Sequence, residues 1–560
     1  MELSIASTGD QLIDEIATSL ISGLERAPDD SLLWQRMGLL LASTSSLEFS
    51  PTLRPWMLRA LQHPHLYPPD IAGSIASMLC RAPLIAALST QAMQGCFPAG
   101  RTLGDVLAQL ADDKLLLALM VTTVVPNAPL EQVFTALRRA LLLGGEDALA
   151  MIDERVLSLI VALAIQAFIV EYVWYVTDEE EQALVALTTR VEEALRCDDI
   201  NDPCVLCWLA IVAAYRPLLE LDHAESLVAG RWSLPVAFAE LIRFQIVEPL
   251  EERVLRRRIP RLTQIHDQIS QKVRQQYEEH PYPRWIRADR APQSISLLAY
   301  MEIIGAEAPR SVSFAKPDVL VAGCGSGMQS IFAATFYRDA KVLALDLSLA
   351  SLAYAKRKTA ELKLTRIEYA QADIMELRKL KRCFHVIESI GVLHHLADPV
   401  AGWKILKSML RSGGIMRIAL YSETARQGVV MARDHIAARN YQPVPADIRR
   451  CRLELLEYPQ DHPVSILRNT ARDFYSMSDC RDLIFHVNEH RFTLPQLQQV
   501  LHELGLRFLC FNQFNPVYLE LYRRRFPDDP AMRSLDNWHL FELEYPDTFI
   551  GTYDFWCQKA

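Results

Sequence analysis

The chain has 560 residues, enough for about three or four domains of ordinary size. Half of the residues are hydrophobic, which excludes a chain dominated by disorder. The net charge of −10 disfavours broad binding to nucleic acid, which usually needs a basic surface. Eleven scattered cysteines and an N-terminal segment without secretory character indicate a reducing, cytoplasmic environment.

Residues 1–260 have the apolar spacing of an α-helical domain. Apolar side chains recur every three or four positions in residues 12–24, 31–41, 103–110, 130–143 and 156–170. The spacing of the helix pairs resembles a tetratricopeptide-like array, although only Trp34 and Gly38 match that repeat. We expect this domain to bind a protein partner or to form a homodimer.

Two features of this domain could suggest other roles. Residues 156–176 are the most apolar run, but their uncharged stretch of 15 residues is short for a membrane span of about 20. We therefore expect a buried helix and no membrane span. Cys204 and Cys207 lie in a predicted helix without a second pair at zinc spacing, so no metal site is expected.

Residues 261–316 are predicted to be a linker and an N-terminal lid. A polar helix over residues 264–277 leads into the segment Tyr-Glu-Glu-His-Pro-Tyr-Pro-Arg-Trp, residues 277–285. Its two prolines end the helix and force an extended chain. A structural proline-rich linker is the alternative interpretation of this segment.

From residue 317 the pattern becomes α/β. Strands are predicted at residues 318–322, 341–345, 366–370, 385–389 and 414–419, and the helices between them favour a parallel sheet. Residues 423–492 interrupt this rhythm as a mostly helical, polar insertion or cap. Residues 493–560 then resume the sheet, with a helix at 493–506 and strands at 507–512 and 553–558.

A glycine turn follows the first of these strands. The spacing Gly323, Gly325, Gly327 is Gly-x-Gly-x-Gly, which matches neither the usual dinucleotide motif nor a phosphate-binding P-loop. Asp346 lies 19 residues beyond Gly327, at the end of the next strand, where a carboxylate can accept hydrogen bonds from ribose hydroxyls.

Over residues 318–419 these motifs, in this order, resemble the class I methyltransferases that depend on S-adenosyl-L-methionine (SAM). The resemblance implies a Rossmann-like domain at residues 317–422, SAM as cofactor, and a seven-stranded sheet whose last strand is antiparallel. It also implies the cofactor-binding residues: Gly323, Cys324, Gly325 and Gly327 at the turn, Asp346 and Leu347 at the ribose, Ala372, Asp373 and Ile374 at the adenine, and Ser389 and Gly391 on the sulfonium side.

The acceptor side is less defined. Candidate catalytic residues are Tyr277, Tyr282 and Trp285 of the lid, and His394, which can also serve only to orient the loop after the fourth strand. The aromatic and charged residues of the insertion predict either substrate contacts or a polar network that supports the cap. Glu388-Ser-Ile-Gly391 replaces the motif typical of DNA amino-methylation, which argues against that chemistry.

The layout and the Tyr277–Trp285 segment also resemble the rickettsial protein-lysine methyltransferases that act on outer-membrane protein B. That resemblance implies a protein substrate methylated on lysine side chains, and a homodimer. A small-molecule O-, N- or C-methyltransferase is the first alternative. A non-catalytic helical scaffold with a SAM-sensing domain is the second, although the intact glycine turn and Asp346 count against it.

Overall fold

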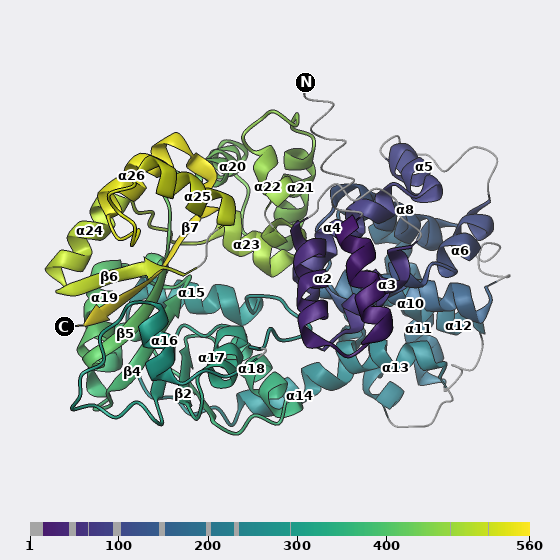
Figure 1. Ribbon diagram of the computed structural model, residues 1–560. Helices are drawn as coiled ribbons and strands as arrows, with labels where there is room; N and C mark the ends of the chain where they lie inside the picture. Colours follow the sequence, from purple (N-terminus) through teal and green to yellow (C-terminus); the bar gives the residue numbers. More distant parts are fainter. Residues whose placement is uncertain are drawn as a thin grey trace. The chain divides into compact units, whose positions relative to one another are not determined.

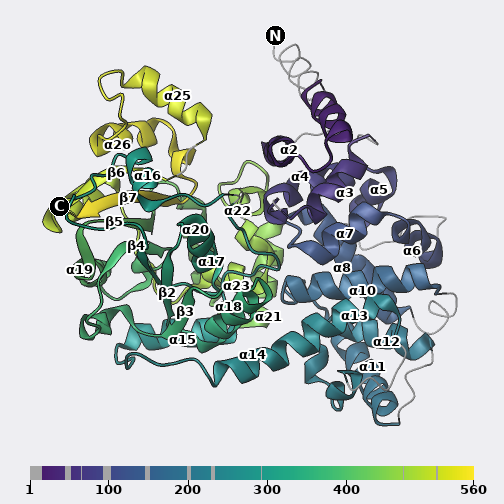
Figure 2. The same cartoon turned by 60° about the horizontal axis from the view of Figure 1, so that its bottom comes forward.

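A computed structural model describes residues 15–43, 52–64, 66–92, 102–144, 152–197, 203–228, 234–291, 293–470, 472–512 and 515–559. The chain divides into two compact units. The helical unit comprises Met1–Leu250, Arg284–Arg287 and Tyr441–Cys480. The sheet unit comprises Glu251–Pro283, Ala288–Asn440 and Arg481–Ala560. Figures 1 and 2 label their elements.

The helical unit follows the apolar spacing of its sequence. Four predicted segments lie within or largely over α2, α6, α8 and α10, and residues 15–24 of the first segment are helical as well. Side-chain caps fix several of the starts, among them Thr102, Asn127 and Asp153. The helices are α2 (Ser31–Ser43), α3 (Arg54–Gln62), α4 (Pro68–Cys80), α5 (Pro83–Ala92), α6 (Leu103–Ala111), α7 (Lys114–Thr122), α8 (Ala128–Leu143), α10 (Glu154–Ile169), α11 (Asp178–Arg196), α12 (Pro203–Ala213), α13 (Val236–Ile242), α21 (Pro445–Leu456) and α22 (Ser465–Thr470).

The apolar run that begins at residue 156 forms the central helix α10. Twelve of its residues are buried, which explains why it lacks a polar face. Within the described ranges no single helix has the length and apolar character needed to cross a membrane. The bent pair Pro68–Cys80 and Pro83–Gln91, which turns by 87°, meets that requirement only jointly, by length and composition.

A buried ion pair joins two parts of the helical unit that are far apart in sequence. Both guanidinium Nη atoms of Arg452 in α21 donate to the carboxylate of Glu131 in α8, at 3.0 and 2.9 Å. The Nε atom of Arg452 donates to the carbonyl of Phe474. Residues 441–480, which we expected to belong to a cap of residues 423–492, therefore pack with the N-terminal helices.

The sheet unit contains the seven-stranded sheet that the sequence predicted. Its order is β3-β2-β1-β4-β5-β7-β6, and β7 pairs antiparallel with both β5 and β6. The other pairs are parallel, so the predicted fold class is confirmed. The strands are β1 (Asp318–Ala322), β2 (Lys341–Asp346), β3 (Ile367–Gln371), β4 (Phe384–Ile390), β5 (Leu410–Tyr421), β6 (Leu506–Phe511) and β7 (Thr552–Lys559).

Helices cover both faces of the sheet (Figure 1). Alternate residues of β1 belong to different hydrophobic cores, since Leu320 and Ala322 are in one buried cluster while Val319 and Val321 are in another. The helices of this unit are α15 (Gln268–Glu279), α16 (Leu297–Ile303), α17 (Met328–Phe336), α18 (Leu349–Glu361), α19 (Pro399–Ser408), α20 (Gln427–Arg439), α24 (Leu494–Glu503), α25 (Pro516–Arg525) and α26 (Leu535–Glu544). Two helices cross the unit boundaries: α14 (Glu248–Arg256) and α23 (Met477–Phe485).

Three element boundaries differ from their predictions for local reasons. α15 begins at Gln268 rather than at residue 264, because the Asp267 carboxylate caps it by accepting the Ser270 N–H. α24 ends at Glu503 rather than at residue 506, and Thr493 caps its start in a capping box with Gln496. β5 begins at Leu410 rather than at residue 414, because a register shift lets Leu410 pair with Phe384.

Candidate functional site

A glycine-rich turn joins β1 to α17. Gly323, Gly325 and Gly327 have φ values of +80°, +50° and +91°, which residues with a Cβ rarely adopt. A Cβ on Gly325 would lie 2.4 Å from the carbonyl oxygen of Tyr282. The thiol side chain of the intervening Cys324 is buried. The turn therefore presents main chain at the carboxyl end of β1, where open α/β sheets bind their ligands.

Asp346 meets this turn directly. Its carboxylate accepts a hydrogen bond from the Gly325 N–H and another from the Ser348 N–H, both at 2.8 Å. Burial raises the pKa of Asp346 to about 6, although these hydrogen bonds act in the opposite direction. The next residue, Leu347, is partly exposed, and its carbonyl accepts the Gln371 amide at 2.8 Å. The sequence placed the turn and the acid at one strand edge, and the structure has them in contact.

The loop after β3 brings Ala372, Asp373 and Ile374 together in a buried position. The Asp373 N–H donates to the Thr263 hydroxyl at 2.8 Å, and one carboxylate oxygen accepts the Met375 N–H at 2.9 Å. The other carboxylate oxygen is buried and has no hydrogen-bond partner among the described residues. A buried acceptor of this kind calls for a donor from a ligand or water.

The loop after β4 separates the two residues that we expected on the sulfonium side. Ser389 is fully buried, and its hydroxyl donates to the Ala322 carbonyl at 3.1 Å. The Ser389 side chain is therefore hydrogen-bonded to the neighbouring strand β1. Gly391 has a φ of +72°, and a Cβ there would meet no atom within 4 Å. Gly391 thus borders open space, whereas Ser389 faces inward.

The segment after α15 is fastened to both sides of this strand edge. At its first end, the Ser348 hydroxyl donates to the Tyr277 carbonyl at 2.9 Å. At its other end, the Ser326 N–H donates to the Tyr282 carbonyl at 3.0 Å, and the Ser326 hydroxyl donates to the Pro283 carbonyl at 2.6 Å. We call residues 277–283 the lid segment, because they bridge the start of α18 and the glycine turn.

Glu278 strengthens the first of these attachments. Its carboxylate accepts the N–H groups of Leu349 and Ala350, at 2.8 and 3.3 Å, in the first turn of α18. A negative charge there also complements the helix dipole. The Arg256 guanidinium pairs with the same carboxylate at 2.5 Å.

The comparisons with known proteins agree with this geometry. The family model described as "Methyltransferase domain" matches residues 319–414, from β1 into β5. Residues 319–414 therefore carry a methyltransferase domain. This confirms the predicted fold class and enzyme class.

Longer similarities extend beyond the methyltransferase domain. An uncharacterised protein of Synechococcus sp. is 27% identical over 319 residues, which cover 52% of this chain and 73% of that protein. PKMT2 from Rickettsia typhi, solved in complex with AdoHcy, is 15% identical with a TM-score of 0.37 over 48% of this chain and 55% of that one. YcgJ of Bacillus subtilis is 13% identical with a TM-score of 0.26 over 47% of this chain and 98% of that one. The chain therefore spans about half of the rickettsial structure that it matches.

The predicted catalytic residues fall into different environments of the methyltransferase. Tyr277 and Tyr282 both belong to the lid segment, and their rings stack with centroids 6.3 Å apart. Trp285 is part of the helical unit and is buried there. Its neighbour Arg284 places its guanidinium 4.9 Å from the ring centre of Phe168. The side chain of Trp285 is thus shielded from solvent.

The Tyr277 hydroxyl lies at the centre of a buried polar group. It donates to the Asp482 carboxylate at 2.5 Å and lies 3.2 Å from Nε2 of His486. Burial and the adjacent Asp482 carboxylate raise the pKa of Tyr277 well above its usual value, and Asp346 adds to this effect. The phenol therefore stays protonated while it is hydrogen-bonded to Asp482.

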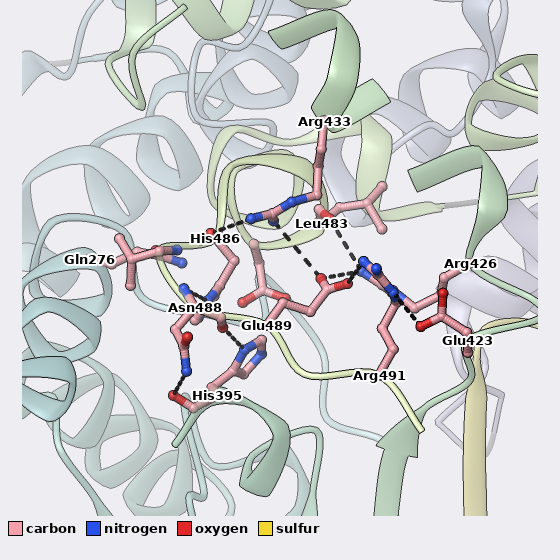
Figure 3. Close-up of polar contacts among 12 residues, drawn as sticks. Gln276, His395, Glu423, Arg426, Arg433, Leu483, His486, Asn488, Glu489 and Arg491 are labelled. Carbon is pink, nitrogen blue, oxygen red and sulfur yellow. Dashed lines mark hydrogen bonds and ion pairs between the residues drawn. The ribbon is translucent and has the colours of Figure 1, made fainter. Parts of the chain in front are cut away.

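Two backbone contacts of Asn488 fix the histidines beside this group (Figure 3). The Asn488 N–H donates to Nδ1 of His486 at 3.1 Å, so the ring proton of neutral His486 is on Nε2, facing Tyr277. The Asn488 carbonyl accepts from Nδ1 of His395 at 2.8 Å, which leaves a lone pair on Nε2 of His395. Burial lowers the pKa of His486 to about 3, so this ring is neutral.

One ligand atom each from His395, Asp482 and His486 lies within 4.8 Å of the others, as in a metal site. A metal on Nε2 of His486 would require the ring proton to move to Nδ1, where the Asn488 N–H already donates. The hydrogen bonds therefore favour a proton-holding group over a metal site. Within the described residues no other cluster of His, Cys, Asp and Glu has metal-like spacing, including the Cys204 and Cys207 pair on α12.

His394 is fully buried in the short turn after β4. Neither ring nitrogen has a hydrogen-bond partner among the described residues, and its ring stacks on Tyr421 with centroids 3.7 Å apart. The Arg426 guanidinium lies 3.5 Å from the centre of the same Tyr421 ring. Burial, followed by the charge of Arg426, holds the pKa of His394 well below its usual value, so His394 is a neutral base.

A charge network holds the 482–491 segment in place (Figure 3). The buried Glu489 carboxylate pairs with Arg426 at 2.9 Å, Arg491 at 3.5 Å and Arg433 at 4.0 Å. Arg491 also pairs with Glu423 at 2.9 Å. The dense opposed charges of the insertion were visible in the sequence, but the roles of Asp482 and His486 depend on contacts with the lid segment that sequence spacing does not show.

Proposed function

We propose that the chain transfers the methyl group of SAM to a protein, with a lysine amine as the acceptor. The observation that carries this proposal is the hydrogen bond from the Tyr277 hydroxyl to Asp482. Tyr277 belongs to the lid segment, and its carbonyl accepts the Ser348 hydroxyl, two residues past Asp346. It supplies a buried carboxylate beside an aromatic hydroxyl, and this combination suits a primary ammonium group that must lose its proton.

The residues of the strand edge fit SAM. The bend at Gly325 allows main chain to approach the nucleoside, and the Asp346 carboxylate is placed to accept the ribose hydroxyls. The unpaired oxygen of Asp373 is an acceptor for the adenine amino group. The open space at Gly391 leaves room on the sulfonium side. Cys324 and Ser389 contribute main chain only, since their side chains are buried elsewhere.

Bound SAM supplies an electrophilic methyl group on a sulfonium, so the protein must chiefly align the acceptor and exclude water. A lysine amine, with a pKa of about 10.4, is protonated near neutral pH and has no free lone pair. Asp482 can take up the proton, with Tyr277 between the carboxylate and the amine. His486, whose Nε2–H faces the Tyr277 oxygen, holds the phenol in orientation.

The helical unit supports a protein as the acceptor. Its helices extend over most of residues 15–250, and extended helical surfaces commonly bind polypeptide segments. A small-molecule acceptor would leave this large unit without a role.

The test is incubation of the full chain with methyl-labelled SAM and fractionated lysate proteins, followed by mass spectrometry. We expect label on lysine side chains of protein bands. Label confined to low-mass extract would contradict the protein acceptor, and label on a different side chain would contradict the lysine assignment.

A further inference from the structure

A cleft lies on the sheet unit, next to the loops that we assign to the cofactor, and its lining includes none of the assigned cofactor residues. It has a volume of about 720 Å³ and is lined by residues from the end of α14, one face of α15 and the start of α18. Its lining residues are Arg256, Arg261, Gln268, Gln271, Lys272, Arg274, Gln275, Glu278, Leu349 and Gln371. We call it the basic cleft.

The charge of this cleft is opposite to that of the whole chain. Four cationic side chains, Arg256, Arg261, Lys272 and Arg274, against the one carboxylate of Glu278 leave a formal charge of +3. The chain as a whole carries −10. A local excess of positive charge on an acidic protein attracts anionic partners to that one place.

Most of the positive charge is available to a partner. Arg256 pairs with Glu278, whose carboxylate is also used by the first turn of α18. Arg261, Lys272 and Arg274 make no ion pair with any of the described residues. Arg261 and Lys272 are also exposed. Three cations without counter-charges repel one another, and a bound anionic group would relieve that repulsion.

The remaining polar surface suits a polypeptide. Gln268, Gln271, Lys272 and Gln275 lie on one face of α15 at helical spacing, so three side-chain amides line the cleft in a row. The amide nitrogen of Gln271 donates to the carbonyls of Ile265 and His266, and that of Gln275 donates to the Glu279 carboxylate. Their amide oxygens remain acceptors for the N–H groups of an extended peptide backbone.

The cleft lies beside the predicted nucleoside site. Leu349 is three residues past Asp346, and Gln371 directly precedes Ala372. Glu278 is part of the lid segment. A chain bound in the cleft would therefore lie next to the loops that we assign to the cofactor.

We propose that the basic cleft binds an acidic segment of a protein partner. This rests on the proposed function in one respect, namely that the partner is the methyl acceptor. Nucleic acid is the less favoured occupant, because the whole chain carries a net charge of −10 and the amide row offers acceptors to a peptide backbone.

The test measures fluorescence anisotropy of a labelled glutamate-rich peptide with the full chain at low salt. The comparison probes are the same peptide with glutamine in place of glutamate, and a single-stranded oligonucleotide of equal charge. The variant combines Arg261→Gln, Lys272→Gln and Arg274→Gln. A matched control combines Lys381→Gln, Lys404→Gln and Arg523→Gln, three exposed cations elsewhere on the sheet unit, and changes the net charge equally.

We expect the glutamate peptide to bind, the cleft variant to bind it about tenfold more weakly, and the control variant to match the wild type. Added salt should weaken binding by the wild type. Equal loss in both variants, no binding of the peptide, or tighter binding of the oligonucleotide would each overturn the proposal. SAM titration of the same proteins keeps this result separate from the proposed function, because the cleft variant should bind SAM as the wild type does.

Discussion

At the scale of single residues, the acceptor side depends on one tyrosine and one carboxylate. The Tyr277 hydroxyl donates a hydrogen bond to Asp482. Neither residue belongs to the glycine turn, and neither is Asp346, the acid that we assign to the cofactor. Changes to these two side chains should therefore alter the chemistry of methyl transfer and leave cofactor binding intact.

Tyr277→Phe and Asp482→Asn should each lower the rate of protein methylation about 10²- to 10⁴-fold. Asp482→Asn removes the carboxylate that accepts the proton, and Tyr277→Phe removes the hydroxyl that links this carboxylate to the amine. The affinity for SAM should stay unchanged. Tyr441→Phe is a matched control, since the Tyr441 hydroxyl also donates to a carboxylate, that of Glu454, at 2.7 Å. The measurement is the initial rate with labelled SAM; wild-type rates in both test variants would contradict the assignment.

The raised pKa of Asp346 predicts a pH dependence of SAM affinity. Its carboxylate must be ionised to accept two ribose hydroxyls well, and its pKa is about 6 in the cofactor-free chain. Affinity should therefore fall as the pH drops below about 6, by at most about tenfold per pH unit. The effect of the same group on folding has the opposite sign. The raised pKa favours the protonated native state, so this contribution to the free energy of unfolding decreases as the pH rises from about 3.9 to about 6.

Asp346→Asn provides the control for this dependence. Its affinity for SAM, measured by calorimetric titration across the same pH range, should be weaker than that of the wild type and flat near pH 6. A slope that persists in Asp346→Asn would assign the titration to another group.

At the scale of elements, the close approach of the lid segment to the glycine turn can be tested by adding a single methyl group. Gly325→Ala would place a Cβ 2.4 Å from the Tyr282 carbonyl, in addition to the cost of a positive φ. We expect a loss of about 1–3 kcal/mol in the free energy of unfolding, together with weaker SAM binding. Gly391→Ala has a similar φ but open space around it, so it should cost less. Equal losses in chemical denaturation would contradict the lid contact.

The elements of the sheet unit were largely predictable from the sequence, because strands and turns have local signals. The short apolar run of residues 318–322 and the glycines that follow it predicted β1 and its turn. The lid contacts were not predictable, because the hydrogen bond from Ser348 to the Tyr277 carbonyl joins residues 71 positions apart. The inward hydroxyl of Ser389 depends on its register with Ala322, which the sequence pattern alone does not fix.

At the scale of the whole molecule, the buried pair of Arg452 and Glu131 joins two parts of the helical unit that are far apart in sequence. Glu131→Gln would leave the buried Arg452 guanidinium without its counter-charge, and should cost about 3–5 kcal/mol. Glu179→Gln removes the partner of Arg139 from an exposed pair between the neighbouring helices α8 and α11, and should cost about 0–1 kcal/mol. Thermal unfolding of both variants measures the difference, and similar losses would show that the buried pair has no special role.

The same pair explains why the domain boundaries were harder to predict than the elements. Residues 441–480 follow β5 in sequence, so a cap on the methyltransferase domain was the natural expectation. Their packing includes the buried pair of Arg452 and Glu131, two charged residues that give no local sign of pairing. Only the three-dimensional structure assigns this segment to the helical unit.

The most direct test of the account is calorimetric titration of the full chain with SAM, for the wild type, Asp346→Ala and Asp536→Ala. Asp536 is an exposed carboxylate at the start of α26 and serves as the control. We expect one SAM site in the wild type and in the control, and binding weakened about tenfold to a hundredfold in Asp346→Ala. Absence of SAM binding by the wild type, or unchanged affinity in a folded Asp346→Ala variant, would contradict the assignment of the cofactor site.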